Sequence, residues 1–318
     1  MKPIICNYYL TYRCNARCGF CDIWEDNTVP ASQEAGLDTI KANLADLKRA
    51  GVKFVDFTGG EPLMHPALPE ALTYAKEIGL RTTVTSNGIL YPRLAEKLAG
   101  NIDILQFSLG GADRDSHDSL RGVKCFDHIN ESVETARSLG EKPTFIFTVT
   151  DDNFERLDEV VAFSRSLNVL LFLNPCFSYP GIDGLSTDNA AKLAGLSRLK
   201  GVTIDRGFLK FIADGGNKRD DPRCLAVRST IVISPDNSLV LPCFHFRESG
   251  LPIDGNLYEI LHSPEVESMK GTEGTFYFCE GCTVYCYIRA SLFRRPDRYF
   301  LPTVLSGLDY FWKLWRAR

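Results

Sequence analysis

The stretch that best predicts the fold and chemistry of this 318-residue chain is Cys14-Asn-Ala-Arg-Cys18-Gly-Phe-Cys21. Its three cysteines are separated by three and then two residues, so one short loop can turn three thiolates toward one point, as a cluster-binding run does. Zinc sites usually have four protein ligands, and no fourth Cys or His lies near this loop. Three thiolates on a cubane would leave one iron without a protein ligand, and that iron could bind a substrate or cosubstrate.

Strand and helix periodicities alternate along the first half of the chain. Strands are predicted at 4–11, 54–58, 81–86, 104–109, 144–150 and 169–173, and helices at 33–50, 68–78, 91–98, 126–139 and 155–167. This alternation predicts an α/β fold with a parallel sheet. Six units are too few to close an eight-stranded barrel, so we expect a partial (β/α)6, TIM-like barrel. Sites in such barrels lie at the carboxyl ends of the strands, and the cysteine loop follows the first strand.

Three further motifs follow the next strands: Gly59-Gly60-Glu61-Pro62, Ser86-Asn87-Gly88, and Ser108-Leu109-Gly110-Gly111 with Arg121 beyond it. Paired glycines let a ligand approach the backbone closely, and small polar side chains can form hydrogen bonds to a ribose. A hydroxyl and a guanidinium are natural donors to a carboxylate. Each motif also has a plainer interpretation: a Gly-Gly turn, an Asn-Gly turn, and an arginine in a surface ion pair.

The cysteine loop, with aromatic Phe20 before its last cysteine, resembles the CxxxCxΦC loop of the radical S-adenosylmethionine (SAM) enzymes. The second motif resembles the GGEP motif of the same family. The resemblance implies a catalytic [4Fe–4S] cluster on Cys14, Cys18 and Cys21, whose open iron binds SAM. It also implies reductive cleavage of SAM to a 5′-deoxyadenosyl radical, which abstracts a hydrogen atom from the substrate.

The resemblance further implies which residues contact SAM. The backbone of the GGEP motif would hold the amino group, and Ser108 and Arg121 would be candidates for the carboxylate. The full predicted set is Phe20, Gly59, Gly60, Glu61, Ser86, Asn87, Ser108 and Arg121. One departure is Gly110, where the family often has Asp.

A second set of cysteines lies after the predicted barrel. Cys224 and Cys243 bracket a predicted hairpin, Ser229 to Ser234 and Leu239 to Leu241, and Cys279 and Cys282 follow. Four such thiols can hold a zinc ion or an iron–sulfur cluster. The region resembles the twitch domain, the short form of the SPASM domain, which implies an auxiliary [4Fe–4S] cluster on these four cysteines. Cys286 is either a substitute ligand or an unused thiol.

We therefore expect three segments: a radical SAM partial barrel at 1–215, a twitch-like cluster domain with a hairpin and helices at 216–290, and a tail at 291–318. Residues 287–318 carry seven Lys or Arg and two Asp. In the tail, aromatic residues are interspersed with cations: Tyr310, Phe311, Trp312 and Trp315 lie near Lys313, Arg316 and Arg318 in the sequence. This suits either a membrane interface or an amphipathic helix docked on the barrel with its basic residues outside.

Composition limits the remaining function classes. A net charge of −4 argues against nucleic acid as a partner, and no apolar run reaches the ~20 residues that span a bilayer. The start of the chain lacks a signal-peptide pattern, so we expect a reducing, cytoplasmic location, with membrane association if the tail binds lipid. The expected partners are a one-electron reductant such as flavodoxin or ferredoxin and a peptide, small-molecule or lipid substrate. The alternative is a non-catalytic iron–sulfur or zinc protein, an electron carrier or scaffold.

Overall fold

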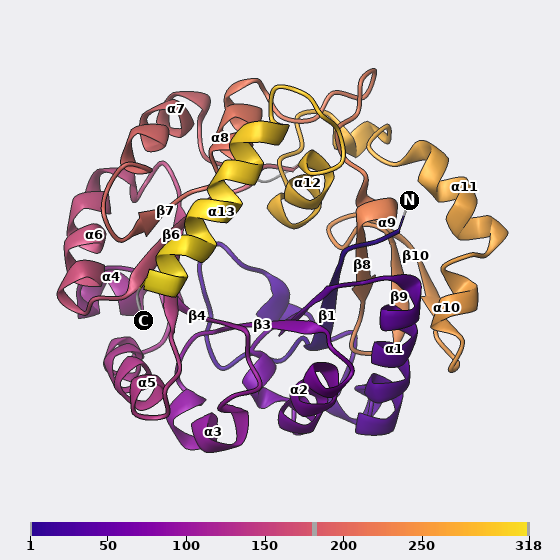
Figure 1. The fold of residues 1–318 in the computed structure, drawn as a ribbon, viewed down its shortest axis with the longest axis horizontal. Coiled ribbons are helices and arrows are strands. Elements are labelled where there is room, and N and C mark those ends of the chain that lie inside the picture. Colours follow the sequence, from indigo (N-terminus) through magenta and orange to yellow (C-terminus); the bar gives the residue numbers. More distant parts are fainter. Residues whose placement is uncertain (1, 180–182, 317–318) are drawn as a thin grey trace. The chain divides into compact units, whose positions relative to one another are not determined.

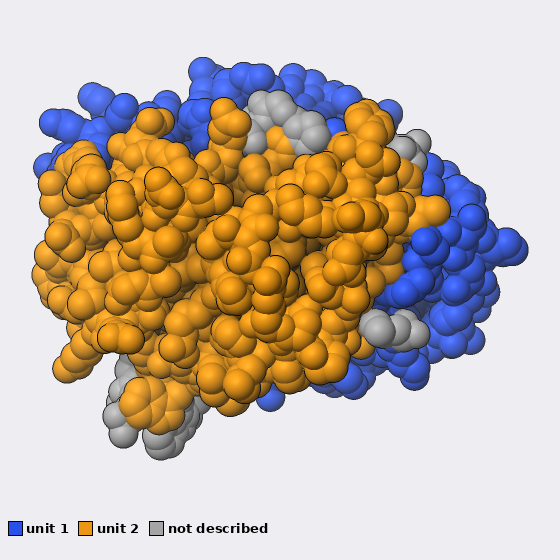
Figure 2. Space-filling view, turned by 90° about the horizontal axis from the view of Figure 1, so that it is seen from above, with its two compact units in different colours: residues 1–143, 227–271 blue, residues 144–226, 272–318 orange. Residues whose placement is uncertain are grey.

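The computed structural model describes residues 2–179 and 183–316, without the side chains of 247, 248, 315 and 316. The chain forms two compact units, each built from two stretches of sequence (Figure 2). Unit 1 contains residues 1–143 and 227–271, and unit 2 contains 144–226 and 272–318. These units do not coincide with the three predicted segments, whose boundaries remain a prediction.

Unit 1 contains the first four strand–helix repeats (Figure 1). Its strands are β1 (Ile5–Thr11), β2 (Phe54–Gly59), β3 (Arg81–Ser86), β4 (Ile104–Leu109), β8 (Thr230–Ile233), β9 (Ser238–Pro242) and β10 (Arg247–Pro252). Its helices are α1 (Leu37–Ala50), α2 (Leu68–Glu77), α3 (Tyr91–Leu98), α4 (Arg114–Arg121), α5 (Phe126–Ser138), α10 (Leu257–Ile260) and most of α9 (Ala226–Ser229) and α11 (Pro264–Thr272). Short 3-10 turns lie at Ile23–Glu25, Ala31–Gln33 and Pro62–Met64.

Strands β1 to β4 pair in parallel, in chain order. Along β2 every second residue is buried, so Val55 and Phe57 share one face while Phe54, Asp56 and Thr58 lie on the other. Helices α1, α2 and α3 lie outside these strands (Figure 1). Helix α1 buries Ile40, Leu44 and Leu47 and ends where Gly51 adopts φ +102°, as a left-handed helix cap requires.

The predicted hairpin is present as β8 and β9, and the structure adds to it in two ways. Strand β8 lies beside β1 in parallel, with Ile5 opposite Thr230, so the hairpin extends the sheet of unit 1. A third strand, β10, pairs antiparallel with β9 and was not predicted. The pairing of β8 with β1 joins residues more than 200 positions apart, and such pairing leaves no local periodicity from which it could be predicted.

Unit 2 contains the remaining repeats and the C-terminal helices. Its strands are β5 (Thr144–Val149), β6 (Leu170–Pro175) and β7 (Val202–Thr203), which pair in parallel in that order. Its helices are α6 (Leu157–Ser166), α7 (Thr187–Leu196), α8 (Arg206–Ala213), α12 (Tyr285–Leu292) and α13 (Phe300–Arg316), with 3-10 turns at Phe154–Arg156 and Tyr277–Cys279. The prediction of an α/β fold with parallel strands is thus confirmed.

Helix α13 contains most of the basic, aromatic tail. One face packs on α8, where the Ser306 hydroxyl accepts a hydrogen bond from the Arg206 amide at 3.0 Å. The opposite face is apolar and exposed, with Leu301, Leu305, Leu308, Phe311 and Trp312 each 45–62% exposed. The side chains of Trp315 and Arg316, and all of Arg318, lie outside the described residues. None of the described helices combines the length and hydropathy that crossing a membrane requires.

Candidate active site

The three cysteines of the N-terminal loop follow β1 directly and are half-buried. Burial is the largest of the effects that raise the pKa of the Cys14 thiol to about 11. A hydrogen bond from the Ala16 amide opposes this shift, and the nearby Glu61, Cys18 and Cys21 add to it. Burial also raises the pKa of Cys21. These three thiols therefore lie within electrostatic range of one another, and metal binding would release their protons.

The donor set of the loop suits an iron–sulfur cluster. Cys14, Cys18 and Cys21 are all free, half-buried thiols. Such clusters are bound by cysteine thiolates, so three thiols on one short loop fit a [4Fe–4S] cluster. Elsewhere among the described residues, His117, Asp118 and Cys125 bring three ligand atoms within 4.8 Å of one another.

The Gly59-Gly60 motif is fixed against the end of β1 and the start of the cysteine loop. The Gly60 amide donates to the Thr11 carbonyl at 2.8 Å, and the Glu61 amide donates to the Arg13 carbonyl at 2.9 Å. A Cβ on Gly59, which has φ +147°, would lie 2.1 Å from the Thr11 oxygen, so a side chain cannot be placed there. Since these amides are engaged, the motif can offer a ligand carbonyl oxygens, the acceptors that an ammonium group needs.

Glu61 links the strand-end motifs to one another. It is 1% exposed, and its carboxylate accepts from the Leu63 amide at 3.2 Å and the Asn87 amide at 2.9 Å. Burial raises its pKa to about 7, although hydrogen bonds from Asn87, Leu63 and Ser86 and the charge of Arg121 oppose the shift. The carboxylate thus holds the loop after β3 against the loop after β2.

Two residues of this network were not identified from the sequence. The Asn87 side-chain amide donates to the Asn15 side-chain oxygen at 2.7 Å, which joins the loop after β3 to the cysteine loop. Arg13 makes a two-pronged contact with Glu34, at 2.9 and 2.8 Å, which fixes the strand end before Cys14. Asn15 lies inside the cysteine loop, and this position could have identified it as a site residue. The pairing of Arg13 with Glu34 could not be inferred, because the local sequence pattern does not indicate it.

Arg121 ends α4 and lies under the cysteine loop. Its carbonyl accepts from the Arg17 amide at 2.8 Å, its Nη1 lies 3.4 Å from the Cys18 sulfur, and its guanidinium carbon lies 6.0 Å from the centre of the Phe20 ring. The residue is only 7% exposed, and its Nε has no hydrogen-bond partner among the described residues. The surface ion-pair interpretation is therefore wrong, because Arg121 is buried and makes no ion pair with a described carboxylate.

His117, Asp118 and Cys125 are close enough to suggest an ion site, but each of the three side chains already has a hydrogen-bond partner in the protein. The His117 Nδ1 accepts from the Gly110 amide at 3.1 Å, and Nε2 lies 3.4 Å from the Cys125 sulfur. Asp118 accepts from the amides of Cys125 and Phe126 at 2.8 and 2.9 Å. Burial and the Arg121 charge lower the pKa of His117 to about 4, so the imidazole is neutral. This group ties α4, and hence Arg121, to the end of β4.

Ser86 and Ser108 occupy the two neighbouring strand ends. Ser86 is buried and its hydroxyl accepts from the Gly88 amide at 3.1 Å, so it shapes its own turn. Ser108 is half-buried on the same face of β4 as Gln106, and its hydroxyl has no partner among the described residues. Of the two, Ser108 is the hydroxyl available to a ligand.

The second cysteine set is divided between the units. Cys224, Cys279 and Cys282 belong to unit 2, with Cys286 in the first turn of α12, and Cys243 follows β9 in unit 1. Burial and, to a smaller extent, the neighbouring Cys282 raise the pKa of Cys279 to about 11, while hydrogen bonds from nearby backbone amides oppose the shift. Cys279 and Cys282 are therefore neighbours within unit 2, and the four-cysteine ligand set stays a prediction.

Residues 8–164 match the family model described as the Radical SAM superfamily. That range contains the cysteine loop, all three strand-end motifs and Arg121. These residues therefore form a radical SAM domain, as the cysteine loop and the GGEP motif predicted, whereas the twitch-like region lies outside the matched range and stays a prediction. This family implies SAM and a [4Fe–4S] cluster, which the donor set of the N-terminal loop fits.

Curated relatives match about half of the chain. A "Probable GTP 3′,8-cyclase" of Sulfolobus acidocaldarius is 30% identical over 163 residues, which are 50% of this chain and 51% of that protein. An "AdoMet-dependent heme synthase" of Methanosarcina barkeri is 28% identical over 173 residues, 54% of this chain and 49% of that protein. The match thus spans about half the length of these relatives.

Solved structures resemble more of the chain. Streptococcus suis SuiB bound to S-adenosylmethionine aligns over 93% of this chain and 73% of its own, with a TM-score of 0.67 and 17% identity. Native anSMEcpe with bound AdoMet aligns over 99% of this chain and 98% of its own, with a TM-score of 0.64 and 16% identity. At such identities these likenesses concern the fold alone, and they agree with the predicted partial TIM-like barrel.

Proposed function

We propose that this protein is a radical SAM enzyme that abstracts a hydrogen atom from its substrate. When bound, the cluster and SAM would supply a 5′-deoxyadenosyl radical by reductive cleavage of SAM. The observation that carries the proposal is that the cysteine loop is hydrogen-bonded to the motifs after β2, β3 and β4. These links are Glu61 to Arg13, Asn87 to Asn15, and Arg17 to Arg121.

In this proposal each motif has a separate task. Cys14, Cys18 and Cys21 hold the cluster, and the carbonyls of Gly59 and Gly60 accept from the amino group of SAM. Ser108 and Arg121 donate to its carboxylate, while Ser86 and Asn87 border the ribose and Phe20 shields the cluster side. Glu61 acts by holding the loops together, because its carboxylate already accepts from two backbone amides.

The charge of Arg121 supports a bound anion. A buried guanidinium without a carboxylate partner is costly, since desolvation of a charge is recovered only by pairing it. The SAM carboxylate and the thiolates of a loaded cluster are both negative, and Arg121 lies 3.4 Å from the Cys18 sulfur. A non-catalytic electron carrier has no use for a carboxylate-binding cation or for the fixed glycine pair, so these residues favour the enzyme.

We also propose an auxiliary [4Fe–4S] cluster on Cys224, Cys279 and Cys282, with Cys243 as the fourth ligand and Cys286 as a possible substitute. Such a centre would accept or supply an electron during oxidation or bond formation in the substrate. Two half-buried neighbouring thiols at Cys279 and Cys282 support it. A structural zinc ion is the alternative, and metal analysis separates the two.

The reductant in this proposal is a one-electron donor such as flavodoxin or ferredoxin, and the substrate is a peptide, a small metabolite or a lipid. For the lipid case we propose peripheral membrane contact through the exposed apolar face of α13. Replacing Leu305 and Leu308 with Ser should then reduce co-sedimentation with anionic vesicles without lowering the melting temperature. Unchanged co-sedimentation would exclude this face as a membrane contact.

The decisive experiment is product analysis under anaerobic conditions. Reconstituted protein incubated with dithionite and SAM should release 5′-deoxyadenosine, and Cys14→Ala should not. No 5′-deoxyadenosine above the level of the Cys14→Ala control would refute the enzymatic proposal and leave the electron carrier or scaffold.

A further inference from the structure

Residues 214–217 form a turn in unit 2 directly after α8. This turn contacts two segments that carry predicted metal ligands: the one that ends at Cys224 and the loop from Cys279 to Cys282. The Gly216 amide donates to the Phe211 carbonyl at 2.9 Å, which ends the helix. Gly216 has φ +73°, and a Cβ there would lie 2.5 Å from the Gly281 carbonyl oxygen. The turn thus packs directly against the Cys279–Cys282 loop, at a distance that only glycine permits.

The next residue, Asn217, is fully buried at 0% exposed and uses every hydrogen-bonding position of its side chain. Its Nδ2 donates to the carbonyls of Gly274 and Cys279 at 2.8 and 3.0 Å. Its Oδ1 accepts from the amides of Arg223 and Cys224 at 2.9 and 3.1 Å. A side-chain amide has two donors and two acceptor positions, so none is left over.

The main chain of Asn217 adds two more contacts to the same loop. Its amide donates to the Cys282 carbonyl at 3.0 Å, and its carbonyl accepts from the Gly281 amide at 2.8 Å. One buried residue is therefore hydrogen-bonded to the peptide groups of Cys224, Cys279 and Cys282. Arg219 links the same two segments nearer the surface, where its amide donates to the Glu280 carboxylate at 3.0 Å and its Nε donates to the Thr275 carbonyl at 2.9 Å.

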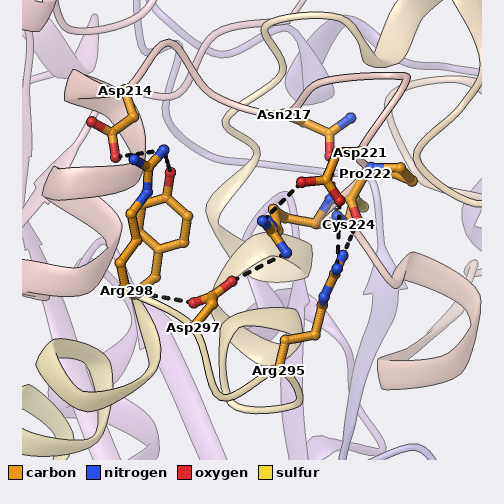
Figure 3. A network of polar contacts seen from close by, with 10 residues as sticks. Asp214, Asn217, Asp221, Pro222, Cys224, Arg295, Asp297 and Arg298 are labelled. Carbon is orange, nitrogen blue, oxygen red and sulfur yellow. Dashed lines mark hydrogen bonds and ion pairs between the residues drawn. The ribbon is translucent and has the colours of Figure 1, made fainter.

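Ion pairs hold the outer side of the same segment (Figure 3). Arg223 pairs with Asp221 at 2.9 Å and with Asp297 at 3.3 Å. Arg295 donates to the Pro222 carbonyl at 2.9 Å and approaches Asp221 at 3.4 Å. The stretch that leads to Cys224 is thus fixed between Asn217 on its inner side and the linker before α13 on its outer side.

We infer that Asn217 is the positioning residue of the auxiliary metal centre, which sets the main chains of Cys224, Cys279 and Cys282 before the metal binds. This inference rests on the proposed auxiliary cluster. Outer residues that orient metal ligands typically account for about 10–100-fold in metal affinity. Asn217 acts on the peptide groups of three ligands at once, so we expect an effect in that range.

Asn217→Asp is the informative variant. The new carboxylate still accepts from the amides of Arg223 and Cys224, but it places an oxygen against the carbonyls of Gly274 and Cys279. The variant should therefore release the Cys279 loop while it retains the Cys224 segment. Asn43→Asp is the matched control, because Asn43 is also buried, at 1% exposed, and its amide donates to the Tyr8 hydroxyl at 2.8 Å in unit 1.

The test uses the full chain with Cys14, Cys18 and Cys21 replaced by Ala, so that only the auxiliary centre can hold iron. After anaerobic reconstitution this background should contain about four irons per chain and give a cluster electron paramagnetic resonance (EPR) signal on reduction. Adding Asn217→Asp should lose most of that iron and the signal, or speed iron loss to a chelator by about 10–100-fold. Adding Asn43→Asp should leave both unchanged.

The outcomes separate the inference from the proposal beneath it. No iron, or zinc alone, in the triple-Ala background would overturn the auxiliary cluster itself. About four irons in that background and in Asn217→Asp, with the same EPR signal and the same chelation rate, would overturn only the role of Asn217. Equal loss in Asn43→Asp would also overturn it, since general destabilisation would then explain the result.

Discussion

Asp56 provides a test of how the inner face of the unit 1 sheet is built. It lies in the middle of β2, between Asn7 of β1 and Thr83 of β3, and its Oδ1 is buried with no hydrogen-bond partner among the described residues. Burial raises its pKa from 3.8 to about 7. An unpaired carboxyl in such a place is more stable protonated than ionised.

Because the pKa of Asp56 is higher in the folded chain than in the unfolded chain, this group lowers the free energy of unfolding as the pH rises. Well below pH 3.8 the group is protonated in both states and has no effect on relative stability. As the pH rises toward 7, the unfolded chain ionises while the folded chain keeps its proton, so this group progressively lowers the free energy of unfolding. Above pH 7 the loss is complete. Three pKa units correspond to about 4 kcal/mol, an upper bound because the side chain is partly exposed.

The assay is urea unfolding of metal-free wild type and Asp56→Asn between pH 4.5 and 8. The difference in free energy of unfolding, variant minus wild type, should increase with pH by up to about 4 kcal/mol and then level off. Asp152→Asn, at an exposed carboxylate, controls for the loss of one charge. A pH-independent difference for Asp56→Asn, or one that decreases as pH rises, would refute the burial of an unpaired carboxyl at this position.

Three other substitutions test the candidate active site. Gly59→Ala should lower the free energy of unfolding by about 1–3 kcal/mol more than Gly100→Ala, because a Cβ at Gly100 has no atom within 4 Å, and equal losses would contradict the close packing on Thr11. Arg121→Gln should raise the Kd for SAM at least about tenfold in equilibrium dialysis with iron content unchanged, and an unchanged Kd would remove Arg121 from the SAM site. His117→Ala should lower the free energy of unfolding by about 1–3 kcal/mol more than His117→Asn does, because the Asn side-chain oxygen can still accept from the Gly110 amide. Thermal unfolding of both variants measures this difference.

The elements of the predicted barrel could be located from the sequence because their signals are local. Strand and helix periods placed β1 to β6 within one or two residues of their observed bounds. The helices α7, α8, α12 and the strand β10 were not predicted. A glycine interrupts the pattern in α7, α8 and β10, whereas α12 is only eight residues long and offers a short periodic signal. The parallel pairing of β8 with β1 depends on backbone that meets only in the folded chain.

The residues of the candidate site also fall into two groups. Some can be identified from the sequence because their chemistry requires one residue type, and the role of the others depends on the folded structure. Iron clusters require thiolates, and a close approach to backbone requires glycine, so Cys14, Cys18, Cys21 and the Gly59-Gly60 pair can be found from residue type and spacing. Arg121 could be proposed as a donor to a carboxylate, but its burial beside Cys18 is a tertiary fact.

Residues that hold loops together have no such signature, because any side chain of suitable length with the right donors and acceptors can serve. Asn217 follows two glycines, as an ordinary turn residue does, yet its amide reaches carbonyls of Gly274 and Cys279 far along the chain. What distinguishes such residues is a polar side chain that is fully buried and fully bonded, as Asn217 and Glu61 are. Substitution should therefore affect the two classes differently: replacing a thiolate removes a ligand outright, whereas replacing a holding residue weakens metal retention in proportion to the hydrogen bonds lost.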